Sequence, residues 1–279
     1  MGEGGVLTGG PWGVPGNWFE GAIPIANSSA IIPDSGQLNA NVTDAGHTAQ
    51  GVDLDLLWVD PLYTKSFGTT AAPIRISGDL IQAYGGGGFY VECDDNGAAV
   101  KIDILDLALA NAGAIAEIGS VVGTEGDIDL INAFRGTITL KANIAFGAAA
   151  MLTVDRIASN SDVNLTNLAT STLATLRQTA GLVTSHGPIT LAYVGAGARL
   201  VQDIAVLATL HLHGMCELKH TALTTVYVYS GGVFDMMKHT NYKTVTNATV
   251  YPGGTLIYDT NLHTISNPFF YPGAIIRGG

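Results

Sequence analysis

The sequence predicts an all-β fold, specifically a right-handed parallel β-helix with an irregular N-terminal cap or docking arm. Three observations lead to this prediction: a repeat of about twenty residues, strand-like segments on both sides of each repeat turn, and the composition. The 279 residues are 47% hydrophobic but only 13% charged, and 36 of them are glycine. Glycine adopts the positive φ that tight turns need, so this composition suits a chain of short strands and turns.

The repeat occupies the C-terminal half of the chain. Each unit has an aromatic or aliphatic residue, a variable residue, a glycine, and then a small or flexible residue. The five units are 193–196, 212–215, 229–232, 251–254 and 271–274. Their glycines recur about every twenty residues, a period that is typical of a solenoid rather than of a globular domain.

The segments around these glycines alternate between apolar and polar residues and are rich in β-formers. Residues 189–193, 225–229 and 246–251 precede a turn in this way, and residues 255–258 follow one. One such coil buries too little apolar area to be stable alone. Stacking coils about 4.8 Å apart pairs the backbone groups and builds an inner column of Val, Ile and Leu.

The chain is expected to divide into an irregular segment, residues 1–49, and a β-helix of about ten coils, residues 50–279. Dense Gly and Pro prevent long regular elements near the start, while Trp12, Trp18 and Phe19 favour burial. Strand-sized segments follow at 52–59, 74–76, 89–92, 100–109, 128–130 and 137–140. Residues 104–118 also fit a helix, although their alternation and Gly113 favour strands.

Charge and cysteine content exclude several classes of protein. The net charge is −11, and residues 1–64 contain seven acids and no Lys or Arg, which argues against nucleic acid as a partner. The start lacks the basic and apolar regions of a secretory signal, and no apolar run is long enough to span a membrane. We expect Cys93 and Cys216 to be two buried free thiols rather than a disulfide.

Three segments resemble the beginning of a known group of proteins. Trp12 and Trp18 in a Gly/Pro-rich opening, the strand at 53–59 and the segment 67–76 are similar to tailed-bacteriophage virion proteins encoded among head genes, which continue as a parallel β-helix. The resemblance covers about residues 10–95, and the remainder is similar only in its period. It implies a location on the capsid surface of the virion, as a decoration protein or head fibre that binds the major capsid protein. On this basis Trp12, Trp18 and Phe19 are candidate docking residues.

An enzyme is the main competing possibility, because β-helices also carry polysaccharide lyases and phage tailspike hydrolases. Glycoside hydrolysis needs two carboxylates facing one cleft, about 5–9.5 Å apart. The candidate pairs are Asp53 with Asp55, Asp94 with Asp95, and Asp127 with Asp129. Alternation along a strand places the first and last pairs on the solvent face. We therefore expect no enzyme activity and no cofactor. The alternative function is a receptor-binding spike that binds or cleaves a cell-surface polysaccharide.

His211 and His213 form the most metal-like pattern. Residues two apart on a strand point to the same face, and a threefold axis would bring six such imidazoles together. Leu210 and Leu212 occupy the other face, and His213 directly precedes the turn at Gly214. An outward polar face therefore explains the pair better than a metal site does.

The last repeat predicts self-association. Residues 269–277 have full strand character, and only two glycines follow them. Solenoids normally need a polar cap over the last coil, because an open coil exposes strand edges and apolar side chains. We expect a homotrimer, in which the copies cover these surfaces for one another.

Overall fold

The fold is entirely built from β-strands. The computed structural model describes residues 5–21, 23–43, 52–93, 102–120, 128–156, 162–219, 222–239 and 241–278. These residues form 23 strands in one hydrogen-bonded sheet, and the one helical element among them is a short 3₁₀ helix, η1 (Pro15–Asn17). Every pairing between named strands is parallel. The prediction of an all-β fold is confirmed.

The strands form two long rows. The first row, in order of pairing, is β1 (Gly5–Val6), β2 (Ser28–Ile32), β3 (Val52–Val59), β5 (Ile74–Ala83), β7 (Ile102–Ala108), β9 (Ile128–Leu140), β10 (Phe146–Val154), β12 (Leu173–Gln178), β14 (Ile189–Val194), β16 (Leu207–Leu212), β18 (Ala222–Val228), β20 (Lys243–Val250) and β22 (His263–Phe270).

The second row is β4 (Ser66–Phe67), β6 (Gly88–Cys93), β8 (Ile115–Ser120), the second half of β9, β11 (Val163–Asn167), β13 (Leu182–Ser185), β15 (Arg199–Gln202), β17 (Met215–Leu218), β19 (Val233–Asp235), β21 (Thr255–Ile257) and β23 (Ile275–Arg277).

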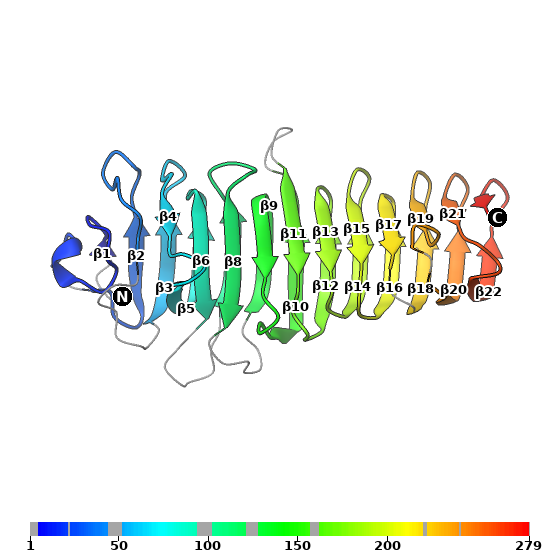
Figure 1. The fold of residues 1–279 in the computed structure, drawn as a ribbon, viewed down its shortest axis with the longest axis horizontal. Helices are drawn as coiled ribbons and strands as arrows, with labels where there is room; N and C mark the ends of the chain where they lie inside the picture. The colour runs from blue at the N-terminus through cyan, green and yellow to red at the C-terminus, as the bar shows by residue number, and fades with distance from the viewer. Residues whose placement is uncertain are drawn as a thin grey trace.

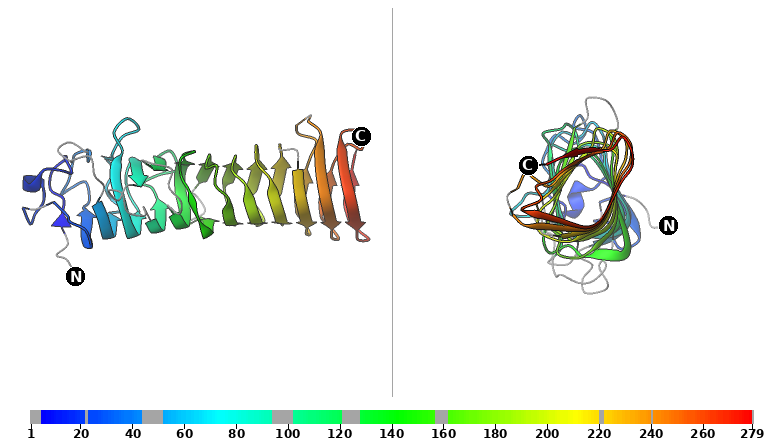
Figure 2. Two further views of the ribbon diagram at one scale, coloured as in Figure 1. Left: turned by 90° about the horizontal axis from the view of Figure 1, so that it is seen from below. Right: turned by 90° about the vertical axis from the view of Figure 1, so that its right-hand side faces the viewer.

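The chain passes from one row to the other and back, so each strand from β11 to β21 pairs with the second strand after it. The result is an elongated rod of stacked rungs (Figure 1), and an end-on view shows the strands of successive rungs one behind another (Figure 2). Strand β9 belongs to both rows, and Gly136, with φ of 117°, lies where it bends from one to the other. Strands β7 and β8 cover most of residues 104–118, so the strand prediction there is confirmed.

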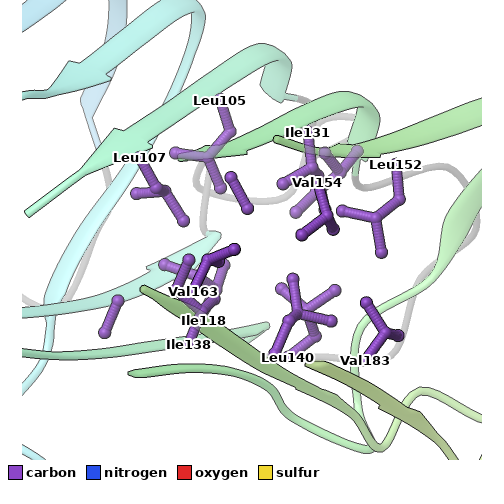
Figure 3. Close-up of a cluster of buried hydrophobic side chains, with 14 of the residues drawn as sticks. Leu105, Leu107, Ile118, Ile131, Ile138, Leu140, Leu152, Val154, Val163 and Val183 are labelled. Atoms are coloured by element: carbon purple, nitrogen blue, oxygen red, sulfur yellow. The ribbon is translucent and has the colours of Figure 1, made fainter. Parts of the chain in front are cut away.

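The core lies between the two rows. Figure 3 shows Leu105, Ile131 and Leu152 from the first row facing Ile118 and Leu140 from the second. All five side chains are at most 1% exposed. Fully burying one such side chain contributes about 1.5–3 kcal/mol, and the same pattern continues along the rod. The expected inner column of Val, Ile and Leu is therefore present.

Parallel pairing begins earlier in the chain than residue 50. Strand β2 pairs with β3 from Ser28 to Ile32, and β1 pairs with β2. The described part of residues 1–49 therefore contributes rungs of its own, and its buried residues belong to the same core as the rest. Most of the other described residues before residue 50 lie outside strands.

The C-terminal turns follow one pattern. In three repeats a backbone N–H donates to the carbonyl of the tyrosine three residues earlier, as from Gly254 to Tyr251 at 2.9 Å. The third residue of each turn is a glycine with positive φ: Gly231 at 81°, Gly253 at 76° and Gly273 at 88°. This is the geometry of a type II turn, in which only glycine fits readily at that position. The sequence pattern identified these three turns correctly.

The first repeat was aligned two residues too early. Its turn runs from Gly195 to Ala198, whose N–H donates to the Gly195 carbonyl at 3.1 Å, and the glycine with positive φ is Gly197. Gly195 therefore takes the place that tyrosine occupies in the later turns. The sequence pattern gave the wrong register because Gly195 and Gly197 both lie close to Tyr193.

Two further expectations concern sulfur and membranes. Cys93 and Cys216 are both buried and are not joined in a disulfide, as predicted. Burial raises the pKa of the Cys216 thiol well above its ordinary value, with smaller contributions from Glu217 and Asp235. No helix in the described part of the chain has the length and apolar character needed to cross a membrane.

Candidate functional site

Two columns of outward residues run along the first row, from β12 to the residues that follow β22; Figure 1 shows the strands that carry them. Strand register defines the Arg177 column as the positions Arg177, Tyr193, His211, Tyr227, Thr249 and Phe269. Two residues further along each strand lies the Gly195 column, formed by Thr179, Gly195, His213, Tyr229, Tyr251 and Tyr271. Because strand residues two apart point the same way, the columns lie side by side.

The register of the Gly195 column is fixed by a repeated hydrogen bond. Each of its members donates its backbone N–H to the carbonyl just before the column in the preceding rung. Gly195 N–H bonds to Gln178 O at 2.7 Å, and His213 N–H bonds to Val194 O at 2.8 Å. The glycine thus occupies a full position in the column, without a side chain.

Aromatic rings stack continuously along the Gly195 column. His213 lies 4.4 Å from Tyr229, Tyr229 lies 4.9 Å from Tyr251, and Tyr251 lies 5.0 Å from Tyr271, measured between ring centroids. Interplanar angles are 6°, 5° and 14°, so the rings follow the rung spacing of the sheet. The stack ends at His213, because Gly195 offers no ring to the other face of its imidazole.

The Arg177 column continues past this point. Tyr193 stacks on His211 at 4.9 Å and His211 on Tyr227 at 4.9 Å, while the Arg177 guanidinium lies 6.0 Å from the centroid of the Tyr193 ring. His211 Nδ1 and the Tyr229 hydroxyl, 3.0 Å apart, link the two columns. Burial lowers the pKa of His211, and neighbouring His213 lowers it further, so the ring is neutral at pH 7.

A hollow of about 420 Å³ lies where the stack is interrupted. Arg177, Tyr193 and His211 line one side, and Thr179, Gly195 and His213 line the rest together with neighbouring backbone. The hollow is thus bounded by one rung below the gap, one rung above it, and the continuous column beside it. Such a concave site with aromatic walls and a few polar groups is typical of small-ligand sites.

The predicted histidine pair lies in this face, but its two rings do not converge on one point. His211 and His213 each stack on tyrosines of their own column, and Leu210 and Leu212 are fully buried on the other face, as expected. In the described residues no group of three or more His, Cys, Asp or Glu side chains could hold a metal. Within one chain the pair is therefore part of an aromatic surface.

Two of the three predicted docking residues lie in the core. Trp12 is 0% exposed and Trp18 is 2% exposed, and their rings meet edge to face at 5.0 Å. Trp12 also meets Phe67 edge to face at 5.6 Å, and Trp18 donates its indole N–H to the Trp12 carbonyl at 2.9 Å. The side chains of Trp12 and Trp18 therefore lie in the core and not on the surface. Phe19 remains 79% exposed.

The predicted carboxylate pairs do not form a site in the described residues. Asp53 and Asp55 are both exposed on β3, and Asp53 accepts a hydrogen bond from the Ser77 hydroxyl at 3.2 Å. Asp129 is half-buried on β9, beside fully buried Ile128. Asp94, Asp95 and Asp127 lie outside the described residues.

A buried charge cluster was missed by sequence reasoning. The Glu217 side chain is 2% exposed, and its carboxylate pairs with Arg199 at 2.5 Å and with Lys238 at 2.8 Å. Burial alone would raise the Glu217 pKa, but hydrogen bonds from Lys238 and Arg199 outweigh it and lower the pKa. The cluster joins three successive rungs of the second row. Strand alternation pointed the wrong way, since it places Glu217, directly after buried Cys216, on the solvent face, whereas Cys216, Glu217 and Leu218 are all buried.

Comparison with protein-family models, with curated proteins and with solved structures gives no significant match. The function must therefore be argued from the geometry of this chain.

Proposed function

We propose that the chain is a right-handed parallel β-helix and that it serves as a non-enzymatic structural protein of a bacteriophage virion. In this role it decorates the capsid or forms a head fibre, and it binds the major capsid protein. The all-parallel pairing of strands in two rows supports the β-helix, as does the alternation of the chain between the rows. The likeness of residues 10–95 to phage head-gene proteins supports the location.

One observation carries the docking proposal: large apolar side chains are exposed at the N-terminal end of the rod. Phe19 is 79% exposed, and Ile25 and Leu62 are each 71% exposed. Phe19 directly follows buried Trp18, and Leu62 directly precedes buried Tyr63, so both exposed side chains are held next to core residues. Exposed apolar side chains on ordered loops suit contact with another protein, because covering them removes apolar area from water.

Binding to capsids tests this proposal. Purified protein is mixed with capsids that lack it, and the bound fraction is measured by co-sedimentation. We expect Phe19→Ser and Ile25→Ser each to weaken binding at least about tenfold, which corresponds to about 1.4 kcal/mol. Ile204→Ser is the matched control, since Ile204 is 59% exposed but lies far along the rod. Equal loss in all three variants, or no binding by the parent protein, would contradict the proposal.

We further propose that the protein is a homotrimer that associates through its last rungs. Apolar side chains of β22 and β23 are exposed there, Phe269 by 57%, Ile275 by 41% and Ile276 by 38%. Contact between copies covers these side chains and leaves β12 to β16 open. Sedimentation equilibrium is expected to give three times the chain mass for the parent protein and a lower mass for Phe269→Ser. A monomeric parent at micromolar concentration would rule the trimer out.

A second candidate function is binding of a cell-surface polysaccharide. The observation that favours it is the hollow beside the aromatic columns, since β-helix spikes that grip glycans need such a site. Cleavage of the polysaccharide would additionally need paired carboxylates. Because the proposed structural role is non-enzymatic, depolymerisation of host polysaccharide by the purified protein would contradict it.

A further inference from the structure

The turn itself does not require a glycine at the break in the Gly195 column, because tyrosine occupies the same place in the later turns. Gly195 does not adopt positive φ, unlike Gly197 two residues later. A Cβ at Gly195 would lie 3.2 Å from Gln178 O and 3.3 Å from Thr179 Cα, so the backbone of the preceding rung must shift by a few tenths of an ångström to admit a side chain. Later rungs carry a histidine or tyrosine at the same position. The absence of a side chain here therefore leaves a ring-sized gap in an otherwise continuous stack.

The gap has the dimensions of one ring. Adjacent rungs of a sheet are about 4.8 Å apart, so a ring placed at Gly195 lies one stacking distance from His213 and one from Thr179. The face of the His213 imidazole that looks toward Gly195 carries no stacking partner among the described residues, while its other face lies 4.4 Å from Tyr229. The hollow of about 420 Å³ exceeds one ring and has room for its substituents.

One cation faces this gap. Arg177 is exposed, lies beside Tyr193, and makes no ion pair with the acids of the described residues. In a chain of net charge −11, most other basic side chains of this half are paired, as Arg199 is with Glu217. A cation without a partner at the edge of a ring-binding hollow favours a ligand that carries a negative charge.

We infer that the hollow at Gly195 binds a single acidic sugar residue, a hexuronic acid within a polysaccharide. The apolar face of the pyranose ring lies on the free face of His213, and its carboxylate pairs with Arg177. His211 Nδ1 is already engaged with the Tyr229 hydroxyl, which leaves His211 Nε2 and the ring nitrogens of His213 for the sugar hydroxyls. Nucleic acid is disfavoured, because one cation in an acidic chain does not hold a phosphate backbone. The inference does not depend on where the protein lies on a virion.

Titration with defined sugars tests this site. The probes are a trisaccharide of galacturonic acid and the matching neutral trisaccharide of galactose, with benzoate as a flat aromatic anion. Calorimetry is expected to give a Kd of about 1 mM for the acidic trisaccharide, the weak affinity of a short ligand with few contacts. Saturation-transfer NMR is expected to show transfer from aromatic protein protons to the sugar ring protons.

Two variants localise the binding. Gly195→Tyr fills the gap and is expected to weaken binding of the acidic trisaccharide more than about tenfold, while Arg177→Gln weakens it about tenfold and removes the preference over the neutral sugar. Thr249→Tyr is the matched control, because it adds a tyrosine to the same face of the rod. Thr249 lies three rungs after Tyr193, outside the hollow, so binding is expected to stay unchanged. Circular dichroism checks folding, and Arg177→Gln carries the test if Gly195→Tyr does not fold.

Three results would overturn the inference. The first is equal binding of the acidic and neutral trisaccharides, and the second is an equal loss in Thr249→Tyr and Gly195→Tyr. The third is stronger binding of benzoate than of the acidic sugar, which would assign the hollow to aromatic rings. None of these results bears on capsid docking through Phe19 and Ile25.

Discussion

Aromatic side chains gather at two places in this rod, with similar contacts but opposite exposure. Near the N-terminus, Trp12, Trp18, Phe67 and Phe89 meet at centroid distances of 5.0 to 5.6 Å, and each is at most 2% exposed. In the C-terminal stack the distances are 4.4 to 5.0 Å, yet Tyr271 is 39% exposed. Ring contacts alone therefore do not determine how much each aromatic cluster contributes to the free energy of unfolding. The inner cluster holds the end of the core, and the outer stack leaves its edges free for recognition.

The largest expected loss in the free energy of unfolding comes from a substitution in the inner cluster. Replacing Trp12 by Ala removes its contacts with both Trp18 and Phe67 and leaves a cavity, which typically costs about 3–5 kcal/mol. Denaturant unfolding followed by Trp fluorescence measures this loss. A loss below about 1 kcal/mol would show that the cluster is not part of the cooperative core.

Glu217 separates the effect of burial from that of position along the rod, because it lies among the regular C-terminal rungs but its side chain is only 2% exposed. Glu217→Gln keeps the shape and removes the charge that Arg199 and Lys238 share. Breaking a fully buried pair costs about 3–5 kcal/mol, and here both cations are partly exposed, so we expect about 1–3 kcal/mol. Unfolding of this variant and of Glu92→Gln, whose partner Arg75 is 3.6 Å away on a more exposed pair, gives the matched comparison. Equal losses would contradict the role assigned to burial.

Truncation in the outer stack is expected to cost less. Tyr251→Ala removes one ring between Tyr229 and Tyr271, and an aromatic pair contributes about 0.5–1.5 kcal/mol beyond its buried area. The free energy of unfolding is expected to fall by less than half of the Trp12→Ala loss. If the two losses match, the outer stack is a structural element as strong as the core.

The smallest expected effect is a change in the free energy of unfolding with pH. Burial lowers the pKa of His211, His239 and His263 from the ordinary value of 6.5. Above pH 6.5 these groups are neutral in both states, whereas below it the unfolded chain takes up protons first. The free energy of unfolding therefore falls as the pH drops from 6.5 toward the folded-state pKa values. His263→Gln is expected to flatten this slope in thermal unfolding between pH 7 and 5, and an unchanged slope would contradict the assignment.

The regular part of the fold was predictable because its signals are local. Tyr-Pro-Gly turns at 251–253 and 271–273 and the alternating strands beside them follow from short-range chemistry. The register of the first repeat was not predictable, since Gly195 and Gly197 both fit a turn and only the pairing with β12 separates them. That two-residue shift conceals the gap in the aromatic stack.

The burial of polar and aromatic side chains was the other feature that could not be predicted from the sequence. The opening around Trp12 and Trp18 predicted burial as well as docking, and the contact of Trp12 with Phe67, far along the chain, decides between them. The carboxylate of Glu217 lies inside with cations from other rungs, and the buried Gln178 amide donates its Nε2–H to Arg199 O on the next rung at 2.9 Å. Such partners are brought together only by stacking, so no local pattern announces them.

A density map of the virion by electron cryomicroscopy would show where the rod is attached and which end contacts the capsid. We expect rods on the capsid surface with the N-terminal end, which carries Phe19 and Ile25, against the major capsid protein and the hollow on β12 to β16 facing solvent. Rods attached to the tail, or rods that contact the capsid through the C-terminal rungs, would contradict the account.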